Sequence, residues 1–167
     1  HWATQMYKLD SHDPKSSSLR WTKGGFQDAR ASPNGAEWYV ENVIEFLDSE
    51  NEYFYDRNSK LLYFQPNYTS PSSWKHQPLV ATNLQTLFSV QGTQSDPVVG
   101  VAFRNLTFRD TAYTFMEAHG VPSGGDWALE NMAAIRAEGT KSLQIDTCRF
   151  LRIDGNGVLV YGYNRNA

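Results

Sequence analysis

The chain of 167 residues contains a single cysteine, Cys148, which excludes an internal disulfide. Its position in an apolar run indicates a small buried side chain rather than a reactive thiol. A formal net charge of −3, with no run of Lys or Arg longer than a pair, argues against nucleic acid or an anionic membrane as a partner. Apolar stretches all fall short of the roughly 18 residues that a membrane span needs, so none is expected.

The start of the chain, HWATQMYKLD, has neither an initiator Met nor a basic-then-apolar signal pattern. We expect any targeting segment to have been removed or to lie outside this piece. Two N-x-[ST] tripeptides, at Asn67 and Asn105, are glycan acceptors if the chain passes through a secretory pathway. Aromatic residues make up 14% of the chain, and their flat rings suit sugar faces as well as a core.

The first eighty residues are predicted to form an N-terminal cap (1–80). Residues 1–40 are punctuated by Ser, Gly and Pro and are expected to be irregular. Apolar residues spaced i, i+3, i+4 and i+7 predict a short helix around 39–48. The residues on its apolar face are Val40, Val43, Ile44 and Leu47. Two aromatic-rich runs flank the polar stretch DRNSK within 52–66, which predicts a β-hairpin.

Residues 81–167 carry a repeating pattern of short strands. Strands are expected at LFSVQG (87–92), AAIRAEG (133–139) and GVLVYG (157–162). Between them, 101–108 and 143–150 superimpose at an offset of 42. The matched residues are Val101 with Leu143, Phe103 with Ile145, Leu106 with Cys148 and Phe108 with Phe150.

A second offset, of 24, superimposes 134–143 on 158–167 and places Ile135 on Leu159. The two offsets differ because of an insertion in 113–131, where EAHGVPSGGDW forms a Gly/Pro-rich loop. Such a repeat is typical of a β-solenoid, whose coils stack their cores. We therefore predict parallel coils with Phe88, Ile135 and Leu159 in one interior column and Phe108 stacked on Phe150. A β-sandwich is the alternative, and it would place hairpin turns between successive strands.

The last residue, Ala167, falls where the next strand of the repeat is expected. An uncapped stack exposes open backbone groups and an apolar cross-section to water. We therefore expect a fragment of a longer β-helix that is not stable alone. Its C-terminal end is expected to meet the remaining coils or neighbouring chains.

Several stretches resemble secreted right-handed parallel β-helix proteins of the pectin-lyase-like class, including β-helix glycoside hydrolases. The matching stretches are GGFQ (24–27), EWYVENVIEFLD (37–48), EYFYDRNSKLLYFQP (52–66), FRNLTFRDTAYTFMEAHGVPSGGDW (103–127) and FLRIDGNGVLVYGYNRN (150–166). The resemblance implies an all-β, extracellular protein with a cap region, right-handed parallel coils and a polysaccharide-directed groove along one face. β-Helices also serve as adhesins and structural walls, so the fold alone does not decide the activity.

The candidate catalytic residues are acidic. At the offset of 24, Asp154 falls on Glu130, each just before a strand. Adjacent rungs lie about 4.8 Å apart, which suits the roughly 5–5.5 Å between the carboxyl groups of a retaining glycosidase. Asp126, in the SGGDW loop, is an alternative to Glu130. Asp154 also precedes Gly155-Asn156-Gly157, where an Asp can hold a turn by bonding to backbone, and this alternative stays open.

Candidate substrate-binding residues lie on the insertion and on the turns near it. His119 is a candidate proton carrier, or a loop residue that bonds to backbone. Trp127 is a candidate to stack on a sugar, or to plug the loop against the solenoid.

Cationic and amide side chains near the turns extend this set. Arg136, Arg165 and Lys141 suit uronic acid or sulfate groups, or an ion-paired surface. Asn164 is a candidate sugar contact, or the start with Arg165 of a side-chain ladder along the stack.

Acidic residues are spread over several faces without liganding spacing, so no metal site is predicted. The sequence has no phosphate loop, zinc spacing or nucleophile elbow, and no cofactor is expected.

The sequence leaves two function classes open. One is a polysaccharide-directed enzyme, a glycoside hydrolase first and a lyase second. The other is a non-catalytic structural or adhesive β-helix module in an extracellular assembly.

Overall fold

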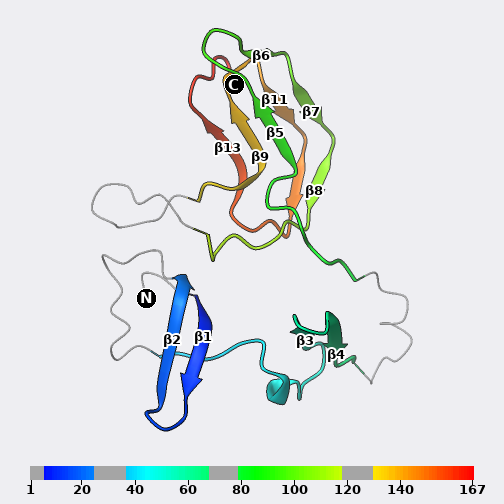
Figure 1. Cartoon of the computed structure of the whole chain (residues 1–167). Helices are drawn as coiled ribbons and strands as arrows, with labels where there is room; N and C mark the ends of the chain where they lie inside the picture. Colours follow the sequence, from blue (N-terminus) through cyan, green and yellow to red (C-terminus); the bar gives the residue numbers. More distant parts are fainter. Residues whose placement is uncertain (1–5, 25–36, 68–78, 118–129) are drawn as a thin grey trace. The chain divides into compact units, whose positions relative to one another are not determined.

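The computed structural model describes residues 6–24, 37–67, 79–117 and 130–167 (Figure 1). These residues are all-β apart from a short 3-10 turn, η1 (Ile44–Phe46). The chain divides into two compact units, Pro33–Val80 on the one hand and His1–Ser32 with Ala81–Ala167 on the other. A helix long and apolar enough to cross a bilayer does not occur in the part of the chain that the structure describes.

Parallel ladders join successive turns of the chain after residue 81 (Figure 1). One ladder has the order β13-β9-β5 and consists of β5 (Phe88–Gln91), β9 (Ala133–Glu138) and β13 (Asn156–Tyr161). The other ladders pair β6 (Val98–Val99) with β10 (Thr140–Lys141), β7 (Ala102–Arg104) with β11 (Gln144–Asp146), and β8 (Thr107–Arg109) with β12 (Arg149–Leu151). The predicted parallel pairing is confirmed. The recurring strand order is compatible with a β-solenoid-like arrangement.

The offset of 42 is confirmed by the register of these ladders. Phe103 pairs with Ile145, and Phe108 pairs with Phe150. The rings of Phe108 and Phe150 stack as predicted, with centroids 5.1 Å apart and planes at 16°. The connections differ in length, because residues 110–132 join β8 to β9 whereas residues 152–155 join β12 to β13. This difference agrees with the predicted insertion.

The predicted place of Leu159 in the interior column is wrong. Phe88 pairs with Ile135 as expected, but Ile135 pairs with Val158, and Leu159 pairs with Arg136. Farther along, Lys141 does bridge to Arg165, as the offset of 24 requires. The turn after β13 therefore holds one residue more than the turn after β9. A register change of one residue moves every side chain of a strand to the other face, so Leu159 shares the outward face with Arg136.

The corners between strands use backbone with positive φ at matching positions. Asn105 (φ 54°) and Thr147 (φ 53°) both lie between the paired strands β7–β8 and β11–β12. Asp110 (φ 61°) and Arg152 (φ 50°) occupy the next corner in the same way. Asn and Asp tolerate this left-handed conformation better than most residues, whereas a β-branched Thr is strained there. The corners thus repeat in conformation even where the residue types differ.

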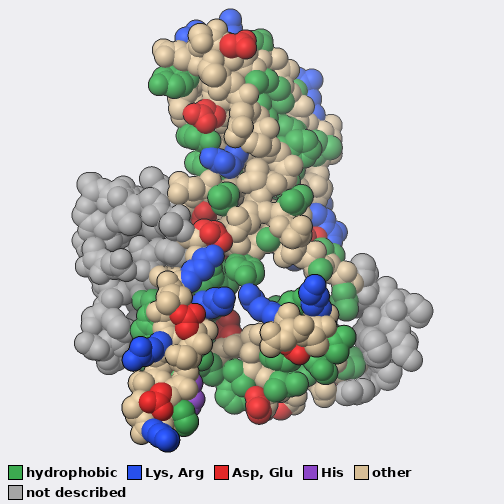
Figure 2. All heavy atoms as spheres, in the orientation of Figure 1, with side chains coloured by type: hydrophobic (Ala, Val, Ile, Leu, Met, Phe, Trp, Pro, Cys, Tyr) green, Lys and Arg blue, Asp and Glu red, His purple; other side chains and the backbone are tan. Residues whose placement is uncertain are grey.

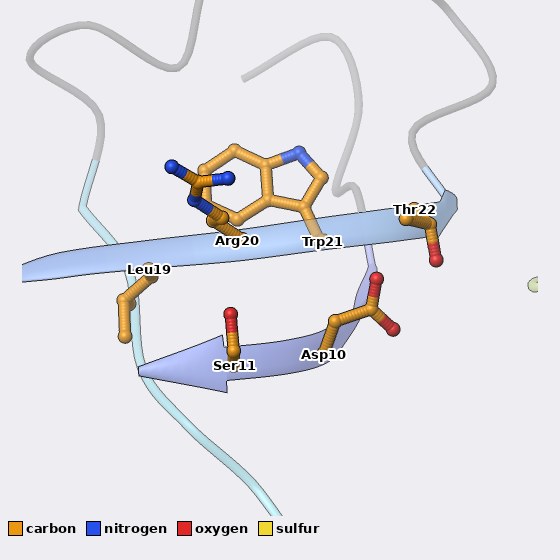
Figure 3. Close-up of a pocket in the computed structure, with 6 residues that line it drawn as sticks. All are labelled: Asp10, Ser11, Leu19, Arg20, Trp21 and Thr22. Carbon is orange, nitrogen blue, oxygen red and sulfur yellow. The ribbon is translucent and has the colours of Figure 1, made fainter. Parts of the chain in front are cut away.

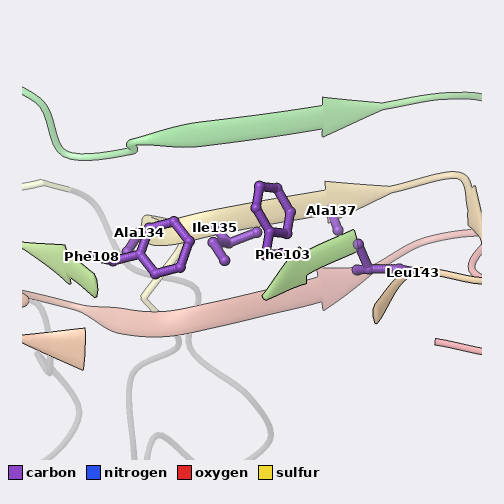
Figure 4. Close-up of a cluster of buried hydrophobic side chains, with 6 residues drawn as sticks. All are labelled: Phe103, Phe108, Ala134, Ile135, Ala137 and Leu143. Carbon is purple, nitrogen blue, oxygen red and sulfur yellow. The ribbon is translucent and has the colours of Figure 1, made fainter. Parts of the chain in front are cut away.

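The core of the repeating part is small and centred on β9. The buried hydrophobic cluster comprises Phe103, Phe108, Ala134, Ile135, Ala137 and Leu143 (Figure 4). Strand β9 is the most deeply buried because it lies between β5 and β13. Phe88 packs edge-on against Phe103, at 5.0 Å between centroids, yet it remains 45% exposed because β5 is an edge of its ladder.

The expectation of an irregular start is wrong. Strands β1 (Tyr7–Asp13) and β2 (Ser18–Gly24) form an antiparallel hairpin with one bulge in each strand, at Asp10 and at Thr22. Asp13 fixes the turn, since its carboxylate accepts hydrogen bonds from Lys15 N at 3.0 Å and Ser16 Oγ at 2.7 Å. Sequence periodicity missed the hairpin because its strands carry mostly exposed polar side chains and the bulges break their alternation.

The unit Pro33–Val80 contains the predicted hairpin but not the predicted helix. Strands β3 (Tyr53–Asp56) and β4 (Leu61–Phe64) pair antiparallel, which confirms the hairpin. In place of a helix over 39–48 there is only η1. Asn42 has a φ of 56°, and its side chain exchanges hydrogen bonds with the Tyr55 backbone, with Tyr55 N donating to Asn42 Oδ1 at 3.1 Å.

The helical pattern also lacks a buried face. Val40, Ile44 and Phe46 are exposed, and η1 has no buried residue. A short helix depends on packing for its stability, so the spacing alone was not enough to form one. Large exposed apolar side chains gather on the visible surface of this unit (Figure 2).

Candidate functional site

Asp154, the first candidate catalytic residue, lies in the turn between β12 and β13 and holds a neighbouring segment. Its Oδ2 accepts hydrogen bonds from both the backbone N–H of Thr114 and, at 2.9 Å, the hydroxyl Oγ1 of Thr114. Its own backbone N–H donates to Thr111 Oγ1 at 2.8 Å. Both threonines are buried. The carboxylate thus holds the backbone of a distant segment, whereas the turn alternative supposed that it bonds the backbone of its own turn.

Glu130 and Asn156 hold the chain on the other side of the insertion. Glu130 Oε1 accepts from Met132 N at 2.8 Å. The amide of Asn156 donates to Glu130 O at 2.8 Å and to Met132 O at 3.2 Å. Residues 152–156 therefore bind the segments that precede and follow residues 118–129.

Gly155 lies close to Glu130 and to Thr114, the residue that Asp154 binds. A Cβ at Gly155 would lie 2.9 Å from Glu130 Cγ and 3.3 Å from Thr114 Oγ1, the hydroxyl bonded to Asp154. The positive φ of Gly155 (78°) also favours glycine. The β13–β9 register sets Glu130 one position away from direct alignment with Asp154. Glu130 and Thr114, the residue that Asp154 binds, thus both approach Gly155, and Glu130 does not lie straight across one rung from Asp154.

The remaining insertion candidates lie outside the described residues. They are Asp126, His119 and Trp127.

Arg136 belongs to a polar row on the outward face of β9 and β13. Ile135 and Ala137 face the core, so alternation turns Arg136 and Glu138 to the other side. Arg136 Nη2 donates to the Tyr161 hydroxyl at 2.6 Å, and its guanidinium carbon lies 5.0 Å from the centroid of the Tyr161 ring. Burial raises the pKa of the Tyr161 phenol, and its hydrogen bond with Glu138 acts in the same direction. Arg136 Nε is buried without a hydrogen-bond partner among the described residues.

Asn164 has its side chain bonded to backbone. Its Oδ1 accepts from Thr140 N at 3.0 Å and Thr140 Oγ1 at 2.6 Å, while its amide donates to Tyr161 O and Ala137 O. These hydrogen bonds join the turn after β13 to the turn after β9. They are the kind of contact between successive turns that a side-chain ladder beginning at Asn164 would make. Lys141 and Arg165 are exposed bridge partners beside it.

The two glycan-acceptor candidates differ in exposure. Asn105 is exposed at the corner between β7 and β8, and its backbone N–H donates to Asp146 O at 3.1 Å. Asn67 is half-buried and follows the buried Pro66. The glycosylation of either remains a prediction.

A charged corner and a hairpin hollow were not anticipated from the sequence. Asp110 accepts hydrogen bonds from the guanidinium groups of Arg152 and Arg109, which together lower its pKa to about 2. A separate hollow of about 570 Å³ lies on the β1–β2 hairpin beside Trp21 (Figure 3). Within the described ranges, no three His, Cys, Asp or Glu side chains gather as metal ligands would.

Sequence reasoning also missed Thr111, Thr114, Glu138 and Tyr161. For Glu138 a signal did exist, because apolar and polar side chains alternate from Ile135 to Glu138, whereas Tyr161 follows the unbroken apolar run 158–160. The two threonines carried no such signal, since they lie on an irregular segment.

Comparison with protein-family models, curated proteins and solved structures gave no match to this chain.

Proposed function

We propose that the chain is part of a secreted right-handed parallel β-helix protein of the pectin-lyase-like kind, acting on extracellular polysaccharide. A glycoside hydrolase is the first form of this proposal and a polysaccharide lyase the second. The stacked parallel ladders support the fold. The residue types on the outward face of β9 and β13 support the ligand class.

One observation carries the proposal: Arg136, Glu138 and Tyr161 form a row on the outward face, in which Arg136 Nη2 donates to the Tyr161 hydroxyl at 2.6 Å. Guanidinium, carboxylate and phenol groups together supply the donors, acceptors and ring face that sugars use. The row runs along the strands that begin just after Glu130 and Asp154.

The hydrolytic form assigns the carboxyl pair to the bond-breaking step. One carboxylic acid would give its proton to the leaving glycosidic oxygen, and the other carboxylate would attack the anomeric carbon or activate water. Water then completes the hydrolysis and restores the proton. Glu130 and Asp154 are the described candidates for these roles, and Asp126 is the third.

The alternative is a non-catalytic structural or adhesive module, and a specific observation favours it. Asp154 binds Thr114 through Oδ2, and Glu130 binds Met132 N through Oε1. Both carboxylates thus hold backbone, a role that needs no substrate.

The test measures polysaccharide binding and cleavage by the whole chain. In affinity electrophoresis through gels containing xylan, mixed-linkage glucan or pectin, at least one polysaccharide should retard the protein. Arg136→Gln should weaken that retardation about tenfold, since one charge-assisted hydrogen bond is worth about 1.4 kcal/mol. Arg149→Gln, on the exposed part of β12, is the matched control and should bind as wild type does.

The enzymatic forms are separated by their products. A hydrolase releases reducing ends alone, whereas a lyase also creates an ultraviolet-absorbing double bond. Binding without either product supports the non-catalytic module. No retardation by any of the three polysaccharides would contradict the proposal.

A further inference from the structure

A second hollow lies where the chain runs into β5. Its lining includes Leu84, Gln85, Thr86, Tyr113 and Met132, and its volume is about 570 Å³. Two hydrogen bonds hold the wall: the backbone N–H of Ala112 donates to Leu84 O at 2.8 Å, and the side-chain amide Nε2 of Gln85 donates to Tyr113 O at 2.9 Å. The hollow is open toward solvent, so a ligand there would lie on a surface rather than in an enclosed cavity.

Tyr113, one ring of an aromatic pair, lines this hollow. The rings of Tyr113 and Phe115 stack with centroids 4.9 Å apart and planes at 27°, and both rings are exposed. Thr114, between them in sequence, is 2% exposed and is bound by Asp154. The hydrogen bonds between Thr114 and Asp154 therefore hold the rings of Tyr113 and Phe115 on the solvent side. Rings that are already fixed in position lose little conformational entropy when a ligand binds.

The chemistry of the hollow suits an uncharged sugar. The polar residues Thr82, Asn83, Gln85 and Thr86 line the same hollow as Tyr113, whose ring is exposed. No Lys or Arg is among its described lining residues, and the carboxylate of Glu117 lies there with Lys23 Nζ at 3.1 Å. An acidic sugar would find no cation available for its own charge, whereas neutral hydroxyls would find both donors and acceptors.

We propose that this hollow is a saccharide subsite that binds a neutral sugar unit through stacking on Tyr113. The inference rests on the proposed function, because it places one unit of the same polysaccharide in a second location. Tyr113 supplies the ring face, and Asn83 supplies an amide to the sugar hydroxyls. Asp154 acts on this subsite as a positioning residue, through Thr114.

The experiment measures dissociation constants of the full chain for xylohexaose, cellohexaose and hexagalacturonate by titration calorimetry. Tyr113→Ala should weaken binding of a neutral hexasaccharide about tenfold, the value of one good aromatic contact. Tyr113→Phe keeps the ring and should stay within about threefold of wild type. Tyr163→Ala removes a comparably exposed tyrosine after β13 and serves as the control.

The outcomes separate the two proposals. Binding of none of the three sugars by wild type sinks this inference, and the polysaccharide gels then decide the proposed function independently. If wild type binds and Tyr113→Ala binds equally well, the subsite is wrong while the proposed function stands. Should Tyr113→Ala fail to fold, Asn83→Ala, at an exposed position, replaces it, and unchanged affinity in that variant counts against the subsite. Tighter binding of hexagalacturonate than of both neutral sugars would overturn the neutral assignment.

Discussion

Asp154 binds Thr114, which lies 40 residues earlier in the sequence. Oδ2 of Asp154 accepts hydrogen bonds from the backbone N–H of Thr114 and, at 2.9 Å, from its hydroxyl. The bond joins the segment that follows β8 to the turn that precedes β13. On the other side of the insertion, the Asn156 amide donates to Glu130 O, and Glu130 Oε1 accepts from Met132 N. Residues 152–156 therefore hold the chain on both sides of the insertion, and we call them the clamp.

Replacing Asp154 separates this clamp from a catalytic role. Asp154→Ala leaves two buried donors of Thr114 without their acceptor, which should lower the free energy of unfolding by about 1–3 kcal/mol. Asp154→Asn keeps one oxygen acceptor and should lose less than half as much, as urea unfolding will measure. A nucleophile or acid would lose turnover equally in both variants, since an amide neither attacks nor exchanges a proton. Equal destabilisation by both would contradict the clamp.

The register of β13 gives a second prediction. Val158 pairs with Ile135 and packs against the core, whereas Leu159 faces outward beside Arg136. Val158→Ala should therefore lower the free energy of unfolding by about 1–2 kcal/mol, because it removes apolar contacts in a packed site. Leu159→Ala is the matched control and should cost less than half of that in the same urea titration. The reverse order would mean that the sequence offset of 24 holds within the strand.

Repeats were easier to predict than single elements. The offset of 42 could be read because Phe103, Phe108 and their partners are apolar at a fixed spacing, and stacked coils demand that regularity. The predicted offset of 24 is wrong by one residue within β13. The extra residue lies in the turn after the strand, and nothing in the residue types of that turn indicates it. The helix over 39–48 failed because periodicity cannot tell whether a face has a partner to pack against.

The sequence predicted which residues belong to the candidate site, but not which residues they contact. The repeat selected Asp154 and Glu130, and the side chain of Glu130 does lie beside Gly155, the residue after Asp154. Their partners Thr114 and Met132 lie on irregular segments, and no periodicity brings such segments together in a sequence. Arg136 was selected for its charge alone, whereas its environment depends on Tyr161, which a register one residue different would turn inward.

The corner at Thr147 predicts a stabilising substitution. Thr147 has a φ of 53°, where a β-branched residue is strained, and the equivalent corner between β7 and β8 carries Asn105. Thr147→Asn should raise the free energy of unfolding by about 0.5–1 kcal/mol, because Asn tolerates this conformation. Asn105→Thr should have the opposite effect of similar size. Urea unfolding of the two variants measures both, and a loss in Thr147→Asn would show that its hydroxyl bond to Asp146 matters more than the strain.

The charged corner at Asp110 predicts how the protein responds to acid. Hydrogen bonds from Arg152 and Arg109 lower the pKa of Asp110 from 3.8 to about 2. A carboxylate with a lowered folded pKa contributes stability that is fully present above the unfolded value and is lost as the pH falls from about 4 toward 2. Arg152→Gln removes the larger of the two causes, so the pKa of Asp110 should rise toward 3.8 and the acid transition should begin at higher pH. Carboxyl-carbon NMR titration of Asp110 reports the pKa directly, and Arg149→Gln, which changes an exposed arginine of β12, should leave it unmoved. An Asp110 pKa that stays near 2 in Arg152→Gln would show that Arg109 alone sustains the shift.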